Sequence, residues 1–199
     1  AQQDDIDNIF PTHCLNIFLF AFVLLIIASF FSKLFLDDFV FSYLSQKPRV
    51  AHDAFRAFPL LGKTFVPIWL LCFWFISTSR IKGITIAILA LVLVFPAVFT
   101  IKSVVRRPRP RDIMSQEWKE ETRNNPFRSW SFPSGDTASV FAVAAAVSYF
   151  MSWYWRPAIF TAAAIVGIMR ITSFSHYPSD VLTGAGVGIF CAWLAVKIA

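Results

Sequence analysis

Three short polar segments of this sequence carry residue types that together bind an oxyanion. The first runs from Lys102 to Pro110, the second from Pro133 to Thr137, and the third from Arg170 to Asp180. Lysine and arginine supply fixed positive charge, and the arginine fork matches the geometry of phosphate oxygens. The segments therefore predict a phosphate site. The candidate phosphate-binding residues are Lys102, Arg109, Ser134, Gly135 and Arg170.

The second and third segments also contain a helix start and a histidine suited to nucleophilic chemistry. Ser134 precedes a long apolar run. We expect it to cap a helix whose first N–H groups and dipole attract an anion. His176 lies four residues before Asp180, and a histidine oriented by a carboxylate can act as nucleophile or base. The sequence shows no spacing typical of metal ligands, so we predict neither a metal nor another cofactor.

The elements that must hold these residues are apolar enough to cross a membrane. Of the 199 residues, 57% are hydrophobic and 15% are charged, and the mean hydropathy is +0.61. Soluble domains carry about 25% charged residues, and a bilayer-spanning helix needs about 20 apolar residues. We predict an all-α integral membrane bundle of six transmembrane helices, forming one domain over residues 1–199. The predicted spans are 15–36, 64–79, 83–101, 137–155, 157–170 and 180–198.

Six spans would place all three polar segments on one face of the membrane. The connection 102–136 is the richest in charge, and the connections after the first and fifth spans fall on the same side. Charges and aromatic residues after the first span predict a partly helical segment at the interface. The formal net charge of +6 favours an anionic partner. Because the basic residues alternate with Pro and Trp between apolar runs, that partner is expected to be an anionic lipid in the bilayer and not a nucleic acid.

The three segments resemble the signature motifs of the type 2 phosphatidic acid phosphatase (PAP2) family, K-x6-RP, PSGH and SR-x5-H-x3-D. The matching residues are Lys102, Arg109 and Pro110 for the first motif, Pro133, Ser134 and Gly135 for the second, and Arg170, His176 and Asp180 for the third. The resemblance implies a membrane lipid phosphatase that needs no metal ion. It also implies that His176 attacks phosphorus and carries the phosphoryl group, while Asp180 orients the imidazole.

Two residues depart from the family pattern. Met169 replaces the serine before the motif-three arginine, and Asp136 replaces the histidine of motif two. That histidine is thought to protonate the departing oxygen, and a carboxyl with an ordinary pKa near about 3.9 would do so less well at neutral pH. We therefore hypothesise that substrates with easy leaving groups are preferred. The expected substrate is an anionic phospholipid, lipid A or a polyprenyl phosphate. Within that class, a polyprenyl diphosphate or a glycosyl phosphate such as lipid A 1-phosphate is favoured over phosphatidate.

Two other functions fit the same sequence. The chain could be a phosphotransferase that passes the phosphate to another lipid, or a catalytically silent phospholipid-binding membrane protein. Orientation is a separate question, since most Lys and Arg lie on the motif-bearing face, and the positive-inside rule would place that face in the cytoplasm. The family resemblance implies a bacterial inner membrane with the site facing the periplasm. We adopt the second expectation because an anionic substrate requires basic residues wherever the site lies.

Several residues near the motifs are expected to have supporting roles. A group of basic residues is expected to attract anionic headgroups without touching the reacting phosphate: Arg106, Arg107, Arg111 and Arg128. Trp153 and Trp155 are expected at the membrane interface. The glycine series in the last span is expected to allow close helix packing: Gly184, Gly186 and Gly188.

Overall fold

The computed structural model describes residues 12–46, 81–114 and 130–199, and these ranges contain helices and no strand. A single isolated bridge joins Pro108 to Trp130. The prediction of an all-α chain is confirmed for these residues. The elements are α2 (Thr12–Phe35), α3 (Asp37–Ser45), α6 (Ile81–Val105), α7 (Pro110–Met114), α10 (Gly135–Ser148), η2 (Trp153–Trp155), α11 (Arg156–Thr172) and α12 (Pro178–Ile198).

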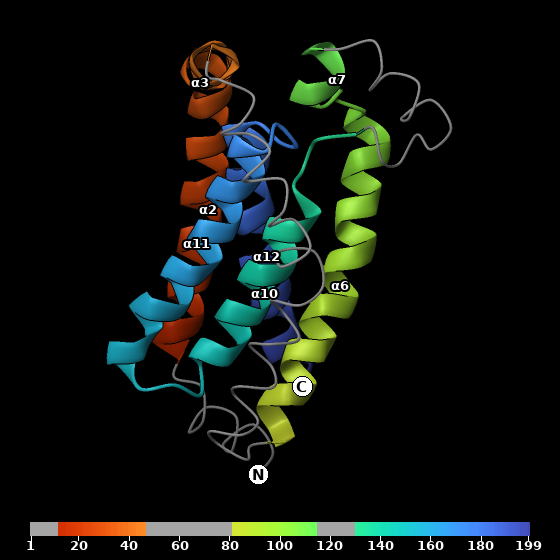
Figure 1. Cartoon of the computed structure of the whole chain (residues 1–199). Helices are drawn as coiled ribbons and strands as arrows, with labels where there is room; N and C mark the ends of the chain where they lie inside the picture. Colours follow the sequence, from red (N-terminus) through yellow and green to blue (C-terminus); the bar gives the residue numbers. More distant parts are fainter. Residues whose placement is uncertain (1–11, 47–80, 115–129) are drawn as a thin grey trace.

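Helix α12 lies at the centre of the bundle, against α2, α6 and α10, while α11 packs mainly on α10 (Figure 1). Two glycines of α12 let its backbone approach that of α10 closely. A Cβ on Gly184 would lie 2.5 Å from the Ser134 carbonyl oxygen, and one on Gly188 would overlap that of Ala138. Gly186 faces side chains of α2 at ordinary contact distance. The prediction of close helix packing is therefore confirmed for Gly184 and Gly188, whereas Gly186 leaves room for a Cβ.

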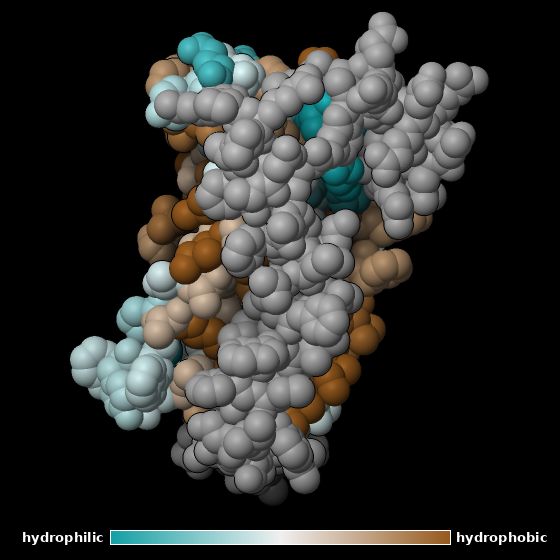
Figure 2. Space-filling model, in the orientation of Figure 1, coloured by the Kyte–Doolittle hydropathy of each residue, from teal (hydrophilic) through white to brown (hydrophobic). Residues whose placement is uncertain are grey.

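Three described helices are long and apolar enough to cross a membrane: Asn16–Phe35, Gly83–Val105 and Pro178–Ile198. The first two present large apolar side chains outward, among them Phe20 at 64% and Phe95 at 74% exposure. Figure 2 shows such apolar side chains on the visible flanks of the bundle. An exposed apolar surface of this extent marks contact with lipid or with another apolar partner.

The helices match most of the predicted spans, with one difference. Spans 15–36, 83–101, 157–170 and 180–198 fall on α2, α6, α11 and α12, whereas 64–79 lies outside the described residues. The predicted span 137–155 is helical only to Ser148, after which the chain turns and forms η2. The hydropathy of the sequence did not predict that the helix ends at Ser148, because the residues that follow are uncharged and mostly aromatic. Trp153, Tyr154 and Trp155 are all exposed, as expected of interface residues.

One end of the bundle gathers the segments singled out in the sequence. Figure 1 shows α3, α7 and the α11–α12 turn at this end, and the C-terminus toward the other. Helix α3 confirms that the segment after the first span is partly helical, and residues 47–63 lie outside the described residues. Helix α10 has 14 residues and α6 has 25, which correspond to about 21 and 38 Å. Helix α10 is the shorter of the two, and its N-terminus, at Ser134 and Gly135, lies at this end of the bundle.

Candidate active site

His176 lies in the short connection between α11 and α12 and is 4% exposed. Pro178 at the first position of α12 fixes where that helix begins. The Nδ1 atom of His176 lies 2.7 Å from the carbonyl oxygen of Ser131. Because a carbonyl oxygen can only accept, Nδ1 carries the proton and Nε2 keeps its lone pair. The ring is therefore held in the tautomer that leaves Nε2 free to attack.

Asp180 stands in the first turn of α12, behind the imidazole. Its Oδ2 accepts a hydrogen bond from the Tyr177 N–H at 2.8 Å and lies 3.8 Å from His176 Nδ1. The second distance is too long for a hydrogen bond, so Asp180 acts on the ring through its charge. The hydrogen bond that orients the ring comes from the main chain of Ser131, a residue that the motifs did not predict.

The surroundings of His176 keep its imidazole neutral. Burial lowers the pKa of His176 from 6.5 to about 4, and the Asp180 carboxylate acts in the opposite direction. The positive charges of Arg109 and Lys102 contribute to this lowering of the pKa. A neutral imidazole is the form that can act as a nucleophile at neutral pH.

Three cations predicted to bind phosphate come from three different elements. Lys102, in the last turn of α6, donates from Nζ to the Trp130 carbonyl oxygen at 2.7 Å. Arg109 follows α6, and its buried Nε has no hydrogen-bond partner among the described residues. Burial, with repulsion from Arg111, lowers the pKa of Arg109 to about 10, so it remains a cation at neutral pH. Its free donor is available to a phosphate oxygen.

Arg170, in the last turn of α11, is 3% exposed. Its Nη2 lies 2.9 Å from Asp136 Oδ2, an ion pair whose angles do not make a hydrogen bond within the described part of the chain. Asp136 is thus placed beside a phosphate-binding arginine. No group of three His, Cys, Asp or Glu side chains able to hold a metal ion occurs in the described ranges.

The start of α10 forms an anion-binding N-terminus. Ser134 is the N-cap: its Oγ accepts from the Thr137 N–H at 3.4 Å, as predicted. Gly135 and Asp136 are the first two residues of α10. The first N–H groups of a helix lack intrahelical partners and can donate to an anion. Ser134 in turn donates from its backbone N–H to the Asp180 carbonyl oxygen at 3.0 Å. This bond ties the start of α10 to the first turn of α12.

The structure brings all eight predicted site residues to the same end of the bundle, but it corrects the role expected for Arg107. Instead of facing headgroups, Arg107 turns inward and contacts Asp180 and Asp37 at 3.0 and 2.9 Å. Its neighbour Arg106 is exposed and lies over the Trp130 ring at 5.6 Å. Two adjacent arginines look alike in a sequence, so only the fold distinguishes them.

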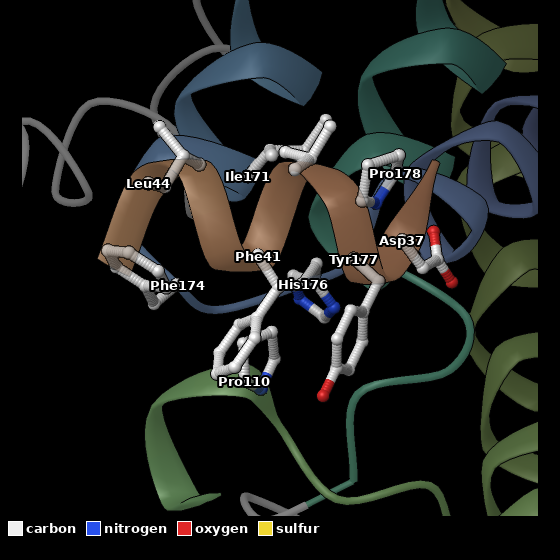
Figure 3. A pocket seen from close by; sticks show the side chains of 10 residues that line it. Asp37, Phe41, Leu44, Pro110, Ile171, Phe174, His176, Tyr177 and Pro178 are labelled. Carbon is white, nitrogen blue, oxygen red and sulfur yellow. The ribbon is translucent and has the colours of Figure 1, made fainter. Parts of the chain in front are cut away.

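A pocket lies beside His176, between α3, α7 and the α11–α12 turn (Figure 3). Its wall is mostly apolar, and it includes Phe41 and Tyr177, whose ring centres lie 6.3 Å apart. Figure 3 labels both residues and His176 among the side chains that line the pocket. The remaining lining residues are Asp37, Val40, Leu44, Pro110, Ile171, Phe174 and Pro178. The pocket therefore gives the imidazole mostly apolar surroundings on this side.

Comparison with known proteins gives consistent similarities. The model of the PAP2 superfamily matches residues 82–199. The crystal structure of Aquifex aeolicus LpxE is 31% identical, with a TM-score of 0.63, over 81% of this chain and 95% of that chain. A PAP2-type phosphatidylglycerolphosphate phosphatase from Bacillus subtilis is 19% identical, with a TM-score of 0.60, over 93% and 94% of the two chains, which supports the fold alone.

A curated relative is similar over a shorter stretch. The Lipid A 1-phosphatase of Porphyromonas gingivalis is 42% identical over 72 residues, which make up 34% of this chain and 16% of that protein. The matched stretch is therefore a small part of that relative's length.

Proposed function

Because this chain belongs to the PAP2 superfamily, we propose that it is an integral membrane lipid phosphatase acting through a phosphohistidine on His176. The geometry of His176 is the observation that carries the proposal. Its Nδ1–H is held by the Ser131 carbonyl oxygen, so that Nε2 keeps a free lone pair. Burial keeps the ring neutral, and the buried Nε of Arg109 has no hydrogen-bond partner among the described residues, so it can donate to a phosphate oxygen.

The proposed reaction has two displacements at phosphorus. In the first, His176 Nε2 forms a bond to phosphorus while the bond from phosphorus to the lipid oxygen breaks. The electron pair leaves with that oxygen, which takes a proton from Asp136 or from water. In the second, a water oxygen attacks phosphorus, the N–P bond breaks, and its electron pair returns to Nε2. The proton that the water gives up goes to the Asp136 carboxylate or stays on the inorganic phosphate as it leaves.

The other site residues act on charge during these steps. Lys102, Arg109 and Arg170 balance the phosphate charge together with the free N–H groups at the start of α10. When Nε2 bonds to phosphorus, the ring becomes positive, and the Asp180 carboxylate 3.8 Å from Nδ1 stabilises it. This scheme requires no metal ion and no other cofactor.

The substrate is proposed from the leaving group that Asp136 can assist. A phosphate leaving from a diphosphate has a second pKa of about 6, whereas a simple alcohol has a far higher pKa, so its alkoxide leaves much less easily. The anomeric oxygen of a glycosyl phosphate lies between the two. An enzyme with aspartate where the family has histidine would therefore favour lipid A 1-phosphate or a polyprenyl diphosphate over phosphatidate. The similarity to a Lipid A 1-phosphatase supports the first of these.

We further propose that residues 1–199 form one domain with six spans in a bacterial inner membrane, with the site facing the periplasm. Three long apolar helices support the membrane placement. The shorter α10 and α11, and the apolar run 64–79 outside the described residues, would complete the count. The PAP2 family resemblance supports the periplasmic side.

The test is phosphate release from a panel of lipids in detergent with EDTA present, comparing the chain with His176→Ala and with the control His13→Ala. The proposal expects release that survives EDTA, vanishes in His176→Ala and persists in His13→Ala. Release from His176→Ala at the normal rate would exclude the phosphohistidine. Phosphorylated acceptor lipid without free phosphate would indicate a phosphotransferase, and lipid binding without turnover a silent binding protein.

A further inference from the structure

Asp37 is a buried carboxylate that belongs to none of the three motifs. It lies in the first turn of α3 and is 1% exposed. Its Oδ1 accepts from the Ser179 N–H at 3.0 Å, and its Oδ2 accepts from the Ser179 hydroxyl and from Arg107 Nη2. A carboxylate buried this completely is costly unless its oxygens are paired, and here both oxygens are. Ser32 Oγ of α2 also donates to Oδ1 at 3.4 Å. The partners of the carboxylate therefore come from α2, from α12 and from the connection after α6.

Arg107 connects Asp37 to the site through two nitrogens of its guanidinium group. Nη2 donates to Asp37 Oδ2 at 2.9 Å, and Nη1 donates to Asp180 Oδ1 at 3.0 Å and to Ser179 Oγ at 2.8 Å. The guanidinium carbon lies 3.7 Å from the centre of the Tyr177 ring. The guanidinium group is therefore held by the Tyr177 ring against its face and by hydrogen bonds from both Nη atoms.

All of these contacts fall on the turn of chain that directly follows His176. Asp37 and Arg107 bind Ser179 by its backbone and its side chain, and Arg107 occupies one oxygen of Asp180. The other oxygen of Asp180 is thereby turned toward the Tyr177 N–H and His176 Nδ1. A shift of Asp37 would thus pass through Arg107 to Asp180.

We propose that Asp37 is a positioning residue for the reaction. Together with Arg107 it docks α3 on the first turn of α12 and holds Asp180 and His176 in the geometry of attack. The proposal rests on the proposed function of His176 as nucleophile. Asp37 itself does not touch the substrate, so its loss should slow the chemical step and leave substrate binding largely unchanged.

The test is Asp37→Asn, an isosteric change that removes the charge and replaces one acceptor oxygen with a donor. The matched control is Asp38→Asn, the adjacent and exposed carboxylate of the same helix. We measure kcat and KM of the purified chain on lipid A 1-phosphate in mixed micelles, or on the panel lipid with the fastest release. We expect kcat to fall about ten- to a hundredfold with KM nearly constant, as for a misplaced reacting group. The Asp38→Asn chain should behave as the wild type.

A double variant tests whether Asp37 acts through Asp180. If it does, Asp37→Asn combined with Asp180→Asn should be about as slow as Asp180→Asn alone, because both changes break one chain of contacts. The proposal would be overturned if the double variant lost kcat by the product of the two single losses. It would also be overturned if folded Asp37→Asn kept the wild-type kcat, or if only its KM changed.

A second variant keeps the test available if Asp37→Asn does not fold. Ser179→Ala removes the hydroxyl that contacts both Asp37 and Arg107, and Ser42→Ala removes an exposed hydroxyl of α3 as its control. A lower kcat in Ser179→Ala alone supports the proposal, and equal kcat values contradict it. His176→Ala separates the two levels: if it is active, the proposed function fails. If it is inactive while Asp37→Asn is normal, the role of Asp37 alone fails.

Discussion

At the scale of single residues, the imidazole of His176 determines the pH range of the site. Burial, assisted by Arg109 and Lys102, lowers its pKa from 6.5 to about 4. We expect the ring to stay neutral below pH 6.5 and to lose its nucleophilic pair only as the pH falls through about 4. The measurement is a titration of ¹⁵N-histidine by NMR in micelles, with His13→Gln and His52→Gln leaving one ring. A titration midpoint near 6.5 would show that burial does not lower the pKa of His176.

Asp136 allows a direct test of the leaving-group hypothesis. Asp136→His restores the PSGH sequence of the family and places a group with a pKa near about 6.5 where the aspartate stood. We expect turnover of phosphatidate to rise relative to lipid A 1-phosphate by about a hundredfold, the lower range for general acid catalysis. Rates on both lipids, measured for the variant and the wild type, give the ratio. An unchanged ratio would show that Asp136 does not determine substrate preference.

The sequence predicted part of the site at this scale and missed the rest for identifiable reasons. Lys102, Arg170 and His176 could be found because fixed spacing distinguishes them from ordinary flanking charges. Asp37 could not, since it stands beside Asp38 and only the break between α2 and α3 turns one inward. Ser131 contributes a backbone carbonyl, and a main-chain atom has no signature in a sequence.

At the scale of elements, the contact between α10 and α12 holds the phosphate-binding turn in place. Gly184→Ala would put a Cβ 2.5 Å from the Ser134 carbonyl oxygen, and backbone on both sides leaves little room to yield. We expect a lower melting temperature, equivalent to about 1–3 kcal/mol for overpacking, together with a lower kcat. Thermal unfolding in detergent and kinetic assays measure the two effects.

Gly186→Ala is the matched control on the same helix. Its Cβ would meet side chains of Phe22, Leu25 and Ile26 at 3.5 Å, an ordinary contact. We expect it to unfold and react as the wild type does. Equal behaviour of the two alanine variants would show that the close approach at Gly184 is not needed.

Helix boundaries show how far local sequence signals reach. The start of α10 was predictable because Ser134 and Gly135 form a capping sequence ahead of an apolar run. Its end at Ser148 was not, because the aromatic residues that follow are as uncharged as the helix itself. A cap is a local signal, whereas a turn between two apolar stretches depends on packing against neighbouring helices.

At the scale of the whole molecule, the two ends of the bundle give a test of orientation. Arg106 is exposed at the site end, and Trp153 is 78% exposed beyond α10. In a chain without Cys14, Cys72 and Cys191, we expect Arg106→Cys to react with a membrane-impermeant maleimide from the periplasm. Trp153→Cys should react only after the inner membrane is opened. The reverse pattern would place the site in the cytoplasm, as the positive-inside rule suggests.

The bond between His176 and Ser131 has a consequence for how this chain can change by mutation. The Ser131 carbonyl oxygen accepts from His176, and two further bonds hold Ser131 in place. Its N–H donates to the Arg107 carbonyl oxygen at 2.7 Å, and its Oγ donates to the Pro108 carbonyl oxygen at 3.1 Å. Every amino acid carries the same carbonyl, so no codon change at position 131 deletes it. Alanine at position 131 would therefore remove the Oγ bond to Pro108 and leave the acceptor of the His176 bond in the chain. Selection on this chain can alter the charges around the ring, while the acceptor itself is common to every allele.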